Sequence, residues 1–197
     1  MRSRPLAFSP RLSENGHMSA VLHIAPMQPD VLAARWRQLL HSGDLDELSE
    51  GYRLELDQFG ELIVSPQPTN RHQVLAGLVC DQLRDALNGF ALAGELRILT
   101  PIGVRTPDGF WTTEPSRVLE EPILRAPEIC IEIASPGDSA EWLARKAAAF
   151  LDAGSQEVIV VSVDGTSARY FRVDGQHDRS AFVNLRLPPL SSWTPAR

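Results

Sequence analysis

The chain has 197 residues, with 19 basic and 25 acidic side chains and a formal net charge of −6. This balance excludes a histone-like or polybasic protein that holds nucleic acid mainly by charge, although it leaves room for a local basic rim. The length suits one domain with a substantial core, and 43% hydrophobic and 22% charged residues are typical of a globular protein. Lys146 is the only lysine, so the other 18 basic residues are arginines.

The ends of the sequence and the two cysteines suggest where the protein resides. No segment approaches the roughly 20 apolar residues of a membrane span, and the start lacks the apolar stretch of a signal peptide. Cys80 and Cys130 lie in separate apolar runs, which favours buried free thiols over a disulfide or a zinc site. We therefore expect a cytoplasmic protein in which residues 1–27 form a poorly ordered tail.

The first third of the chain predicts a helix, a β-hairpin and a second helix. Residues 29–42 carry apolar side chains at helical spacing, and Gly43 follows as a stop signal. Two alternating runs within residues 52–65 flank Gln58-Phe59-Gly60, a pattern that predicts a β-hairpin. A second helix is predicted from about residue 70 to residue 87.

The sequence after residue 90 predicts further strands and one more helix. The strands are expected at residues 95–105, 110–118, 128–135, 157–163 and 168–173, with a last one near 180–187, and the helix at 139–153. Pro107-Asp108-Gly109 is interpreted as the turn between the first two of these strands. The order of elements predicts one mixed α/β domain over residues 28–197, with a sheet flanked by helices.

Lys146 occupies an unusual position in the last predicted helix. A helical projection places it on the apolar side, one turn from both Trp142 and Phe150, whereas Arg145 falls on the polar side. Either the side chain of such a lysine extends along the apolar surface so that its ammonium reaches solvent, or the buried ammonium pairs with carboxylates. Both interpretations of Lys146 remain open from the pattern alone.

Glu132 is a possible carboxylate partner of this lysine. Alternation within residues 128–133 places Glu132 on the face opposite the isoleucines, shortly before the loop into the lysine helix. A strand carboxylate followed by an inward lysine can form a metal and general-base site. The alternative is a strand face exposed to solvent.

Several motifs, in matching order, resemble the Uma-type family of putative restriction endonucleases, within the PD-(D/E)XK nuclease superfamily. They are Gly60-Glu61 followed by Ser65-Pro66 and His72, the run over residues 127–136, and the segment from Lys146 to Ala153-Gly154. The resemblance covers about residues 50–175. It implies an α/β (α+β) fold with a restriction-endonuclease-like mixed β-sheet flanked by helices, an N-terminal helix and a β-hairpin.

The resemblance also implies a set of site residues. Glu132 and Lys146 match the family's strand glutamate and displaced lysine, while Ala134 stands where the superfamily pattern has its lysine. For the aspartate of the family's Pro-Asp pair we favour Glu114, and the literal Pro107-Asp108 upstream is the alternative. Glu114, Glu132 and the backbone carbonyl of Ile133 would then bind Mg²⁺ or Mn²⁺, with Lys146 activating the attacking water.

Two further residues match family positions. Glu61 is expected to reach the same cleft, unless it is an exposed hairpin carboxylate. His72 is expected to contact a phosphate or a carboxylate, unless it is a partly exposed histidine at a helix end. Motifs of ATPases, serine hydrolases and zinc proteases are absent from the sequence.

The leading hypothesis is a Mg²⁺- or Mn²⁺-dependent endonuclease that hydrolyses phosphodiester bonds in DNA, and the resemblance implies a homodimer. The rival is a catalytically degenerate relative that acts as a binding or structural module. The departure from the Pro-Asp pattern at Glu114 motivates this rival.

Overall fold

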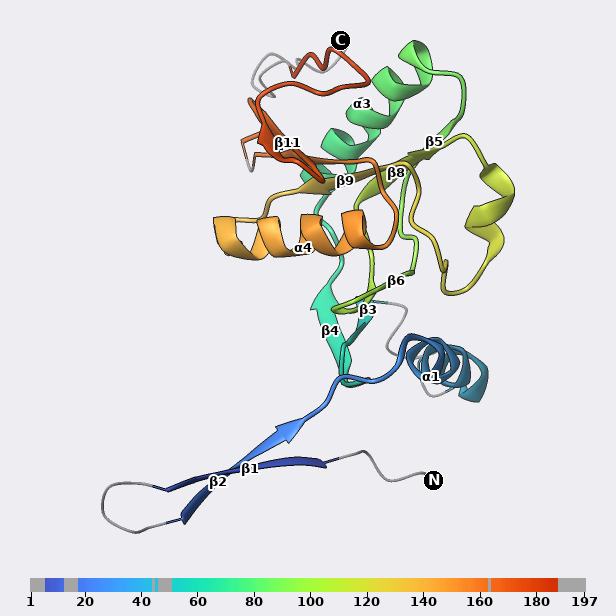
Figure 1. Cartoon of the computed structure of the whole chain (residues 1–197). Coiled ribbons are helices and arrows are strands. Elements are labelled where there is room, and N and C mark those ends of the chain that lie inside the picture. The colour runs from blue at the N-terminus through green and yellow to red at the C-terminus, as the bar shows by residue number, and fades with distance from the viewer. Residues whose placement is uncertain (1–5, 13–17, 44, 46–50, 163, 188–197) are drawn as a thin grey trace.

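The computed structural model describes residues 6–12, 18–43, 45, 51–162 and 164–187, and Figure 1 shows their arrangement. Its centre is a six-stranded mixed sheet in the order β12-β11-β10-β9-β8-β5. In chain order these strands are β5 (Phe90–Ala93), β8 (Gly109–Thr112), β9 (Ile129–Ile133), β10 (Glu157–Val161), β11 (Ala168–Arg172) and β12 (Gly175–His177). Only the β9–β10 pair is parallel.

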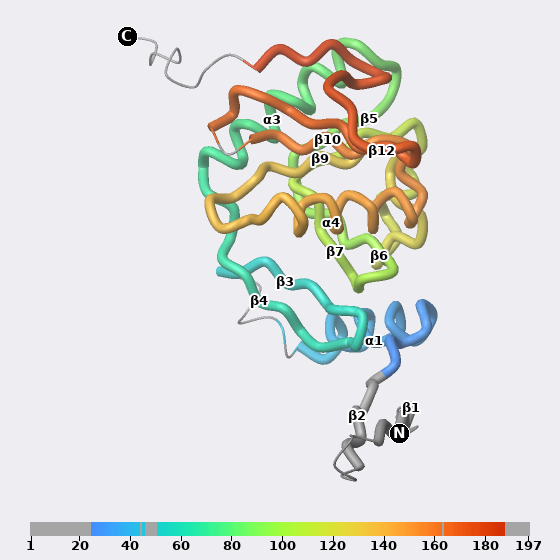
Figure 2. Tube along the Cα trace, turned by 60° about the vertical axis from the view of Figure 1, so that its left-hand side comes forward, coloured from blue at the N-terminus to red at the C-terminus, as the bar shows by residue number. Residues whose placement is uncertain are grey.

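A second sheet lies next to this one and has the order β4-β3-β7-β6. Its strands are β3 (Tyr52–Asp57), β4 (Leu62–Pro66), β6 (Ile98–Thr100) and β7 (Gly103–Arg105). Helix α1 (Pro29–Ser42) packs against it and buries Trp36. Figure 2 shows α1 with β3 and β4 at one end of the molecule, below the main sheet. The predicted N-terminal helix and hairpin are confirmed as α1 and β3–β4.

Two helices cover opposite faces of the main sheet, as Figure 1 shows. Helix α3 (Asn70–Ala86) packs on the face that carries Ile129, Ile131 and Ile133 of β9. Helix α4 (Ala140–Asp152) packs on the other face, together with Cys130. Both faces of β9 and β10 are therefore covered, which explains why these strands are fully buried.

Helix α4 begins where the sequence supplies a capping residue. The side chain of Ser139 accepts a hydrogen bond of 3.0 Å from the backbone N–H of Trp142, which satisfies one of the free amides of the first turn. The helix connects β9 to the parallel strand β10, so it must cross one face of the sheet. This crossing brings Lys146 over the end of β9.

Two predicted strands differ from the structure. Where one strand was predicted over residues 95–105, residues 98–105 form the short hairpin β6–β7, because Pro101 has no amide hydrogen and Gly103 adopts a φ of 129°. Within residues 110–118 the strand β8 ends at Thr112, and a 3-10 helix follows at Pro115–Leu119.

The strand predicted near 180–187 is also wrong, since the described part of this segment is irregular. Its backbone is bound by side chains instead of a neighbouring strand. The N–H of Ala181 donates to the buried carboxylate of Glu157, and Gln82 of α3 exchanges hydrogen bonds of 2.7 and 2.9 Å with the backbone of Arg186. The edge of the sheet beyond β11 is taken by β12.

The N-terminal stretch contains a separate pair of antiparallel strands, β1 (Leu6–Leu12) and β2 (Met18–Ile24). Residues 1–5 and 13–17 lie outside the described part, so the expected poorly ordered tail over residues 1–27 stays a prediction. Among the residues that are described, no helix combines the length and the apolar character needed to cross a bilayer.

Candidate active site

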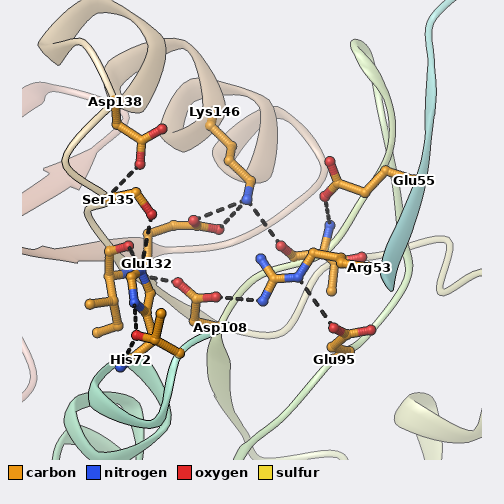
Figure 3. Close-up of polar contacts among 12 residues, drawn as sticks. Arg53, Glu55, His72, Glu95, Asp108, Glu132, Ser135, Asp138 and Lys146 are labelled. Carbon is orange, nitrogen blue, oxygen red and sulfur yellow. Dashed lines mark hydrogen bonds and ion pairs between the residues drawn. The ribbon is translucent and has the colours of Figure 1, made fainter. Parts of the chain in front are cut away.

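A pocket of about 420 Å³ opens where the two sheets meet α4. Strand β3 and the segment after β4 form one side, and the carboxyl end of β9 forms the floor. The first two turns of α4 form the other side. Figure 3 shows the charged side chains from these elements pointing toward one another.

Lys146 and Glu132 form a buried ion pair at the bottom of this pocket. The Lys146 Nζ atom lies 3.0 Å from both carboxylate oxygens of Glu132 and donates a further hydrogen bond of 3.0 Å to the backbone carbonyl of Thr106. The side chains of Lys146 and Glu132 are only 9% and 5% exposed. Helical and strand periodicity therefore placed both groups as expected, and the interpretation of a solvated strand face at Glu132 is wrong.

The charges of this pair are set by burial and by their neighbours. Burial disfavours the charged form of Lys146, but the negative charges of Glu132, Glu55 and Asp108 outweigh it and raise the pKa of the ammonium. Burial raises the pKa of Glu132, while the positive charge of Lys146 opposes this effect and favours the carboxylate. Lys146 is thus a fixed cation that donates hydrogen bonds rather than a proton acceptor.

Asp108 brings the second carboxylate to the site. Its Oδ2 accepts a hydrogen bond of 2.8 Å from the backbone N–H of Ile133, and its Oδ1 pairs with Arg53 at 2.6 Å. The backbone N–H of Asp108 in turn donates to the carbonyl of Ile131 at 2.9 Å. These contacts fix Asp108 beside the end of β9, where Glu132 emerges.

Glu114, the carboxylate that we favoured from the sequence, lies elsewhere. Its side chain is 59% exposed, pairs with Arg117, and does not line the pocket. The preference for Glu114 over Asp108 is therefore corrected. Pro107-Asp108-Gly109 is not a hairpin turn, because β7 belongs to the second sheet and β8 to the main sheet, and the chain crosses between them at Asp108.

The side chain of His72 contacts the site at the backbone carbonyl of Ile133. From the first turn of α3, its Nε2 lies 3.1 Å from the carbonyl oxygen of Ile133 and 3.1 Å from the hydroxyl of Ser135. Figure 3 shows His72 and Ser135 side by side. Thr69, the N-cap of α3, lies 3.1 Å from its Nδ1. These contacts orient the Ile133 carbonyl, and the expected contact of His72 with a phosphate stays a prediction.

Glu61 does not reach this site. It is exposed in the turn between β3 and β4, where its backbone N–H donates to the Asp57 side chain, and it is not part of the pocket lining. The alternative interpretation, an exposed hairpin carboxylate, agrees with this position.

Strand β3 supplies two charged residues that sequence reasoning missed. Arg53 binds Asp108, and its Nε lies 3.3 Å from Glu95. Glu55 pairs with Arg105 at 3.0 Å and accepts a hydrogen bond of 2.7 Å from the Thr106 backbone. The signal available in the sequence was the alternation of charged and apolar residues along β3, which we assigned only to a hairpin.

Three carboxylates of the pocket are each paired with a cation. Glu55, Asp108 and Glu132 are each matched by one cation, and the partners are respectively Arg105, Arg53 and Lys146. The formal charge of these six groups is therefore zero when all are ionised. Asp138 also lines the pocket and is not part of these pairs, so it adds one negative charge.

The donor atoms fit a hard divalent ion. In the part of the chain that the structure describes, Glu132 Oε1 is buried and accepts no hydrogen bond, although it lies 3.0 Å from Lys146 Nζ, so it is free to bind an ion. Asp108 and the Ile133 carbonyl supply further oxygen atoms at the same end of β9. Among the described residues, no cluster of three or more His, Cys, Asp or Glu side chains could hold a metal. Two carboxylates and a carbonyl match Mg²⁺, which usually binds through one or two carboxylates, waters and substrate phosphates.

Comparison with known proteins agrees with this architecture. The family model described as "Uma2: Putative restriction endonuclease" matches residues 36–195. The crystal structure of a putative nuclease belonging to DUF820 from Anabaena variabilis ATCC 29413 is similar, with a TM-score of 0.50 and 20% sequence identity over 64% of this chain and 76% of that chain. At this identity the likeness concerns the fold alone, and it confirms the restriction-endonuclease-like α/β prediction. No curated protein matches the chain.

Proposed function

Because this chain belongs to the Uma2 family of putative restriction endonucleases, we propose that it is a divalent-metal-dependent nuclease that hydrolyses phosphodiester bonds in DNA. The observation that carries the proposal is the convergence of Asp108, Glu132 and Lys146 in one pocket. Two carboxylates can hold a divalent ion, and a charged lysine beside them can stabilise the negative charge that develops during phosphodiester hydrolysis.

Asp108, Glu132 and the carbonyl of Ile133 are proposed to hold Mg²⁺ or Mn²⁺. When bound, the ion would supply positive charge to the phosphoryl oxygens and acidify the attacking water. His72 and the Ile133 amide keep the carbonyl and the Asp108 carboxylate in place by hydrogen bonds of 3.1 and 2.8 Å. The ligands are thus positioned by the backbone at the end of β9.

Lys146 is proposed to orient the water and to stabilise the negative charge that develops on the phosphoryl group. Two of its N–H bonds are directed to Glu132 and the Thr106 carbonyl, which leaves one for a water or a phosphate oxygen. In the reaction, the attacking water loses a proton to solvent and its oxygen forms a bond to phosphorus. The bond from phosphorus to the leaving deoxyribose oxygen breaks, and that oxygen takes up a proton from solvent. A preorganised ammonium in a buried site stabilises such a transition state strongly.

The rival hypothesis of a catalytically degenerate module was motivated by the apparent departure from the Pro-Asp pattern, and the position of Asp108 removes that motive. It depended on Glu114 in place of the family aspartate, whereas Pro107-Asp108 is intact and Asp108 lies in the pocket. A single incubation separates the two hypotheses. Purified protein with plasmid or single-stranded DNA and Mn²⁺ should produce cleavage that EDTA abolishes.

The same cleavage should fall strongly in Glu132→Gln and Lys146→Ala proteins that remain folded. Undiminished cleavage by these variants would overturn the assignment of the site. Absence of cleavage with any divalent metal, together with no metal-induced rise in melting temperature, would favour the binding or structural module.

A further inference from the structure

We propose that the substrate of this site is single-stranded DNA, which enters the pocket and stacks a base on Trp142. The proposal rests on the nuclease function proposed above and specifies its substrate class. Three independent features of the pocket support it, namely its depth, the distribution of its charges and the aromatic residue in its wall.

The reacting groups lie too deep for an intact duplex. Lys146 and Glu132 are 9% and 5% exposed, and Asp108 is 6% exposed. A phosphodiester must therefore enter the pocket of about 420 Å³ before it can meet them. Duplex DNA is stiff over about 150 base pairs and holds its phosphates on a regular cylinder, whereas a single strand can bend one phosphate inward.

The charges of the pocket lining do not offer the contacts on which duplex binding depends. All three lysine and arginine side chains that line it, Arg53, Arg105 and Lys146, are paired with carboxylates inside the pocket. The remaining polar side chains of the lining are largely uncharged, and Asp138 adds a negative charge near the N-terminus of α4. Duplex binding depends on arginines and lysines that neutralise several phosphates along the backbone. The lining offers no such row, so it does not supply the electrostatic contacts of a duplex-binding surface.

Trp142 supplies a surface on which a base can stack. It lines the pocket from the first turn of α4 and is partly exposed. The guanidinium of Arg105 lies 5.6 Å from the centre of its ring, and Glu55 holds that guanidinium at 3.0 Å. The Arg105 guanidinium therefore holds the indole in place from one side. Stacking on such an aromatic residue contributes about 1–3 kcal/mol per base and suits single strands.

Binding measurements with a labelled oligonucleotide of about 12 nucleotides test the proposal, a length within the range that single-stranded DNA sites cover. Ca²⁺ replaces Mn²⁺ to prevent cleavage, and fluorescence anisotropy compares the single strand with the same sequence as a duplex. We expect the single strand to bind at least about tenfold more tightly. Trp142→Ala should weaken single-strand binding by about tenfold, while Trp142→Phe, which retains an aromatic ring, should keep most of it.

Phe90→Ala is the matched control, because Phe90 is an exposed aromatic residue outside the pocket lining. Melting curves check that each variant is folded. If Trp142→Ala is not folded, Trp142→Leu, which also lacks an aromatic ring, takes its place and should weaken single-strand binding to the same extent. Equal or tighter binding of the duplex, or equal effects of Trp142→Ala and Phe90→Ala, would overturn the substrate class. If wild-type protein still cleaves DNA with Mn²⁺ in that case, the nuclease function stands. If it neither binds nor cleaves either form, both proposals fail.

Discussion

The backbone N–H of Ile133 donates a hydrogen bond of 2.8 Å to the Oδ2 atom of Asp108, two residues that are far apart in the sequence. Ile133 directly follows Glu132 in β9, so this one bond places both carboxylates at the same end of the sheet. The contact depends on the crossing of the chain from β7 into β8. It is therefore a property of the tertiary fold rather than of a local motif.

Asp108→Asn should abolish the stabilisation that the protein gains from Mn²⁺. The amide keeps an oxygen for the Ile133 N–H but loses the charge that would hold a divalent ion. Thermal unfolding with and without Mn²⁺ measures this gain, which follows from binding to the native state. Glu114→Gln removes an exposed carboxylate outside the pocket and should retain the full shift. The opposite pattern would restore the Glu114 assignment.

Lys146→Met should lower both stability and activity. It leaves the Glu132 carboxylate buried without its cation, which costs about 3 kcal/mol in the free energy of unfolding. Loss of a preorganised donor should lower the cleavage rate by about 100-fold or more. Arg145→Met is the control, since the adjacent side chain on α4 is exposed. Chemical denaturation and initial cleavage rates measure the two effects, and similar losses in both variants would contradict the role of Lys146.

Arg53→Gln should increase the affinity of the site for Mn²⁺ by about tenfold. The guanidinium lies 2.6 Å from Asp108 Oδ1 and opposes a second cation by electrostatic repulsion. Isothermal titration calorimetry measures the affinity directly. Arg97→Gln removes a partly exposed arginine outside the pocket and should leave the affinity unchanged. Weaker Mn²⁺ binding by Arg53→Gln would show that Arg53 supports the ligands instead of competing with the ion.

Cys80 should make the fold less stable at high pH. Burial raises its pKa from 9.0 to about 11, so the unfolded thiol ionises first as the pH rises. Its contribution is complete below pH 9 and falls between pH 9 and 11, by about 1.4 kcal/mol per pH unit. The difference in unfolding free energy between wild type and Cys80→Ala, measured across this range, isolates the effect. A constant difference would contradict the prediction.

The sequence could predict the site residues whose direction follows from their place on a helix or a strand. The period of a helix fixes the direction of Lys146, and the alternation of a strand fixes that of Glu132, so their meeting followed from two local patterns. The same reasoning predicted both free cysteines to be buried, and this is confirmed. The helices and the central strands were predictable for the same reason.

The position of Asp108 could not be predicted in this way. Pro107-Asp108-Gly109 has the composition of a turn, and local chemistry does not reveal that the flanking strands enter different sheets. Arg53 was missed for a related reason, because its partners Glu95 and Asp108 lie 42 and 55 residues away in the sequence. Such pairings depend on how the sheets are placed against each other.

The cleavage rate of Asp108→Asn relative to Glu114→Gln tests the central claim most directly. Both variants are incubated with single-stranded DNA and Mn²⁺, after melting curves have shown that they are folded. The account predicts that Asp108→Asn loses cleavage by about 100-fold or more, whereas Glu114→Gln cleaves at the wild-type rate. Wild-type cleavage by folded Asp108→Asn would contradict the assignment of the pocket formed by Asp108, Glu132 and Lys146 as the active site.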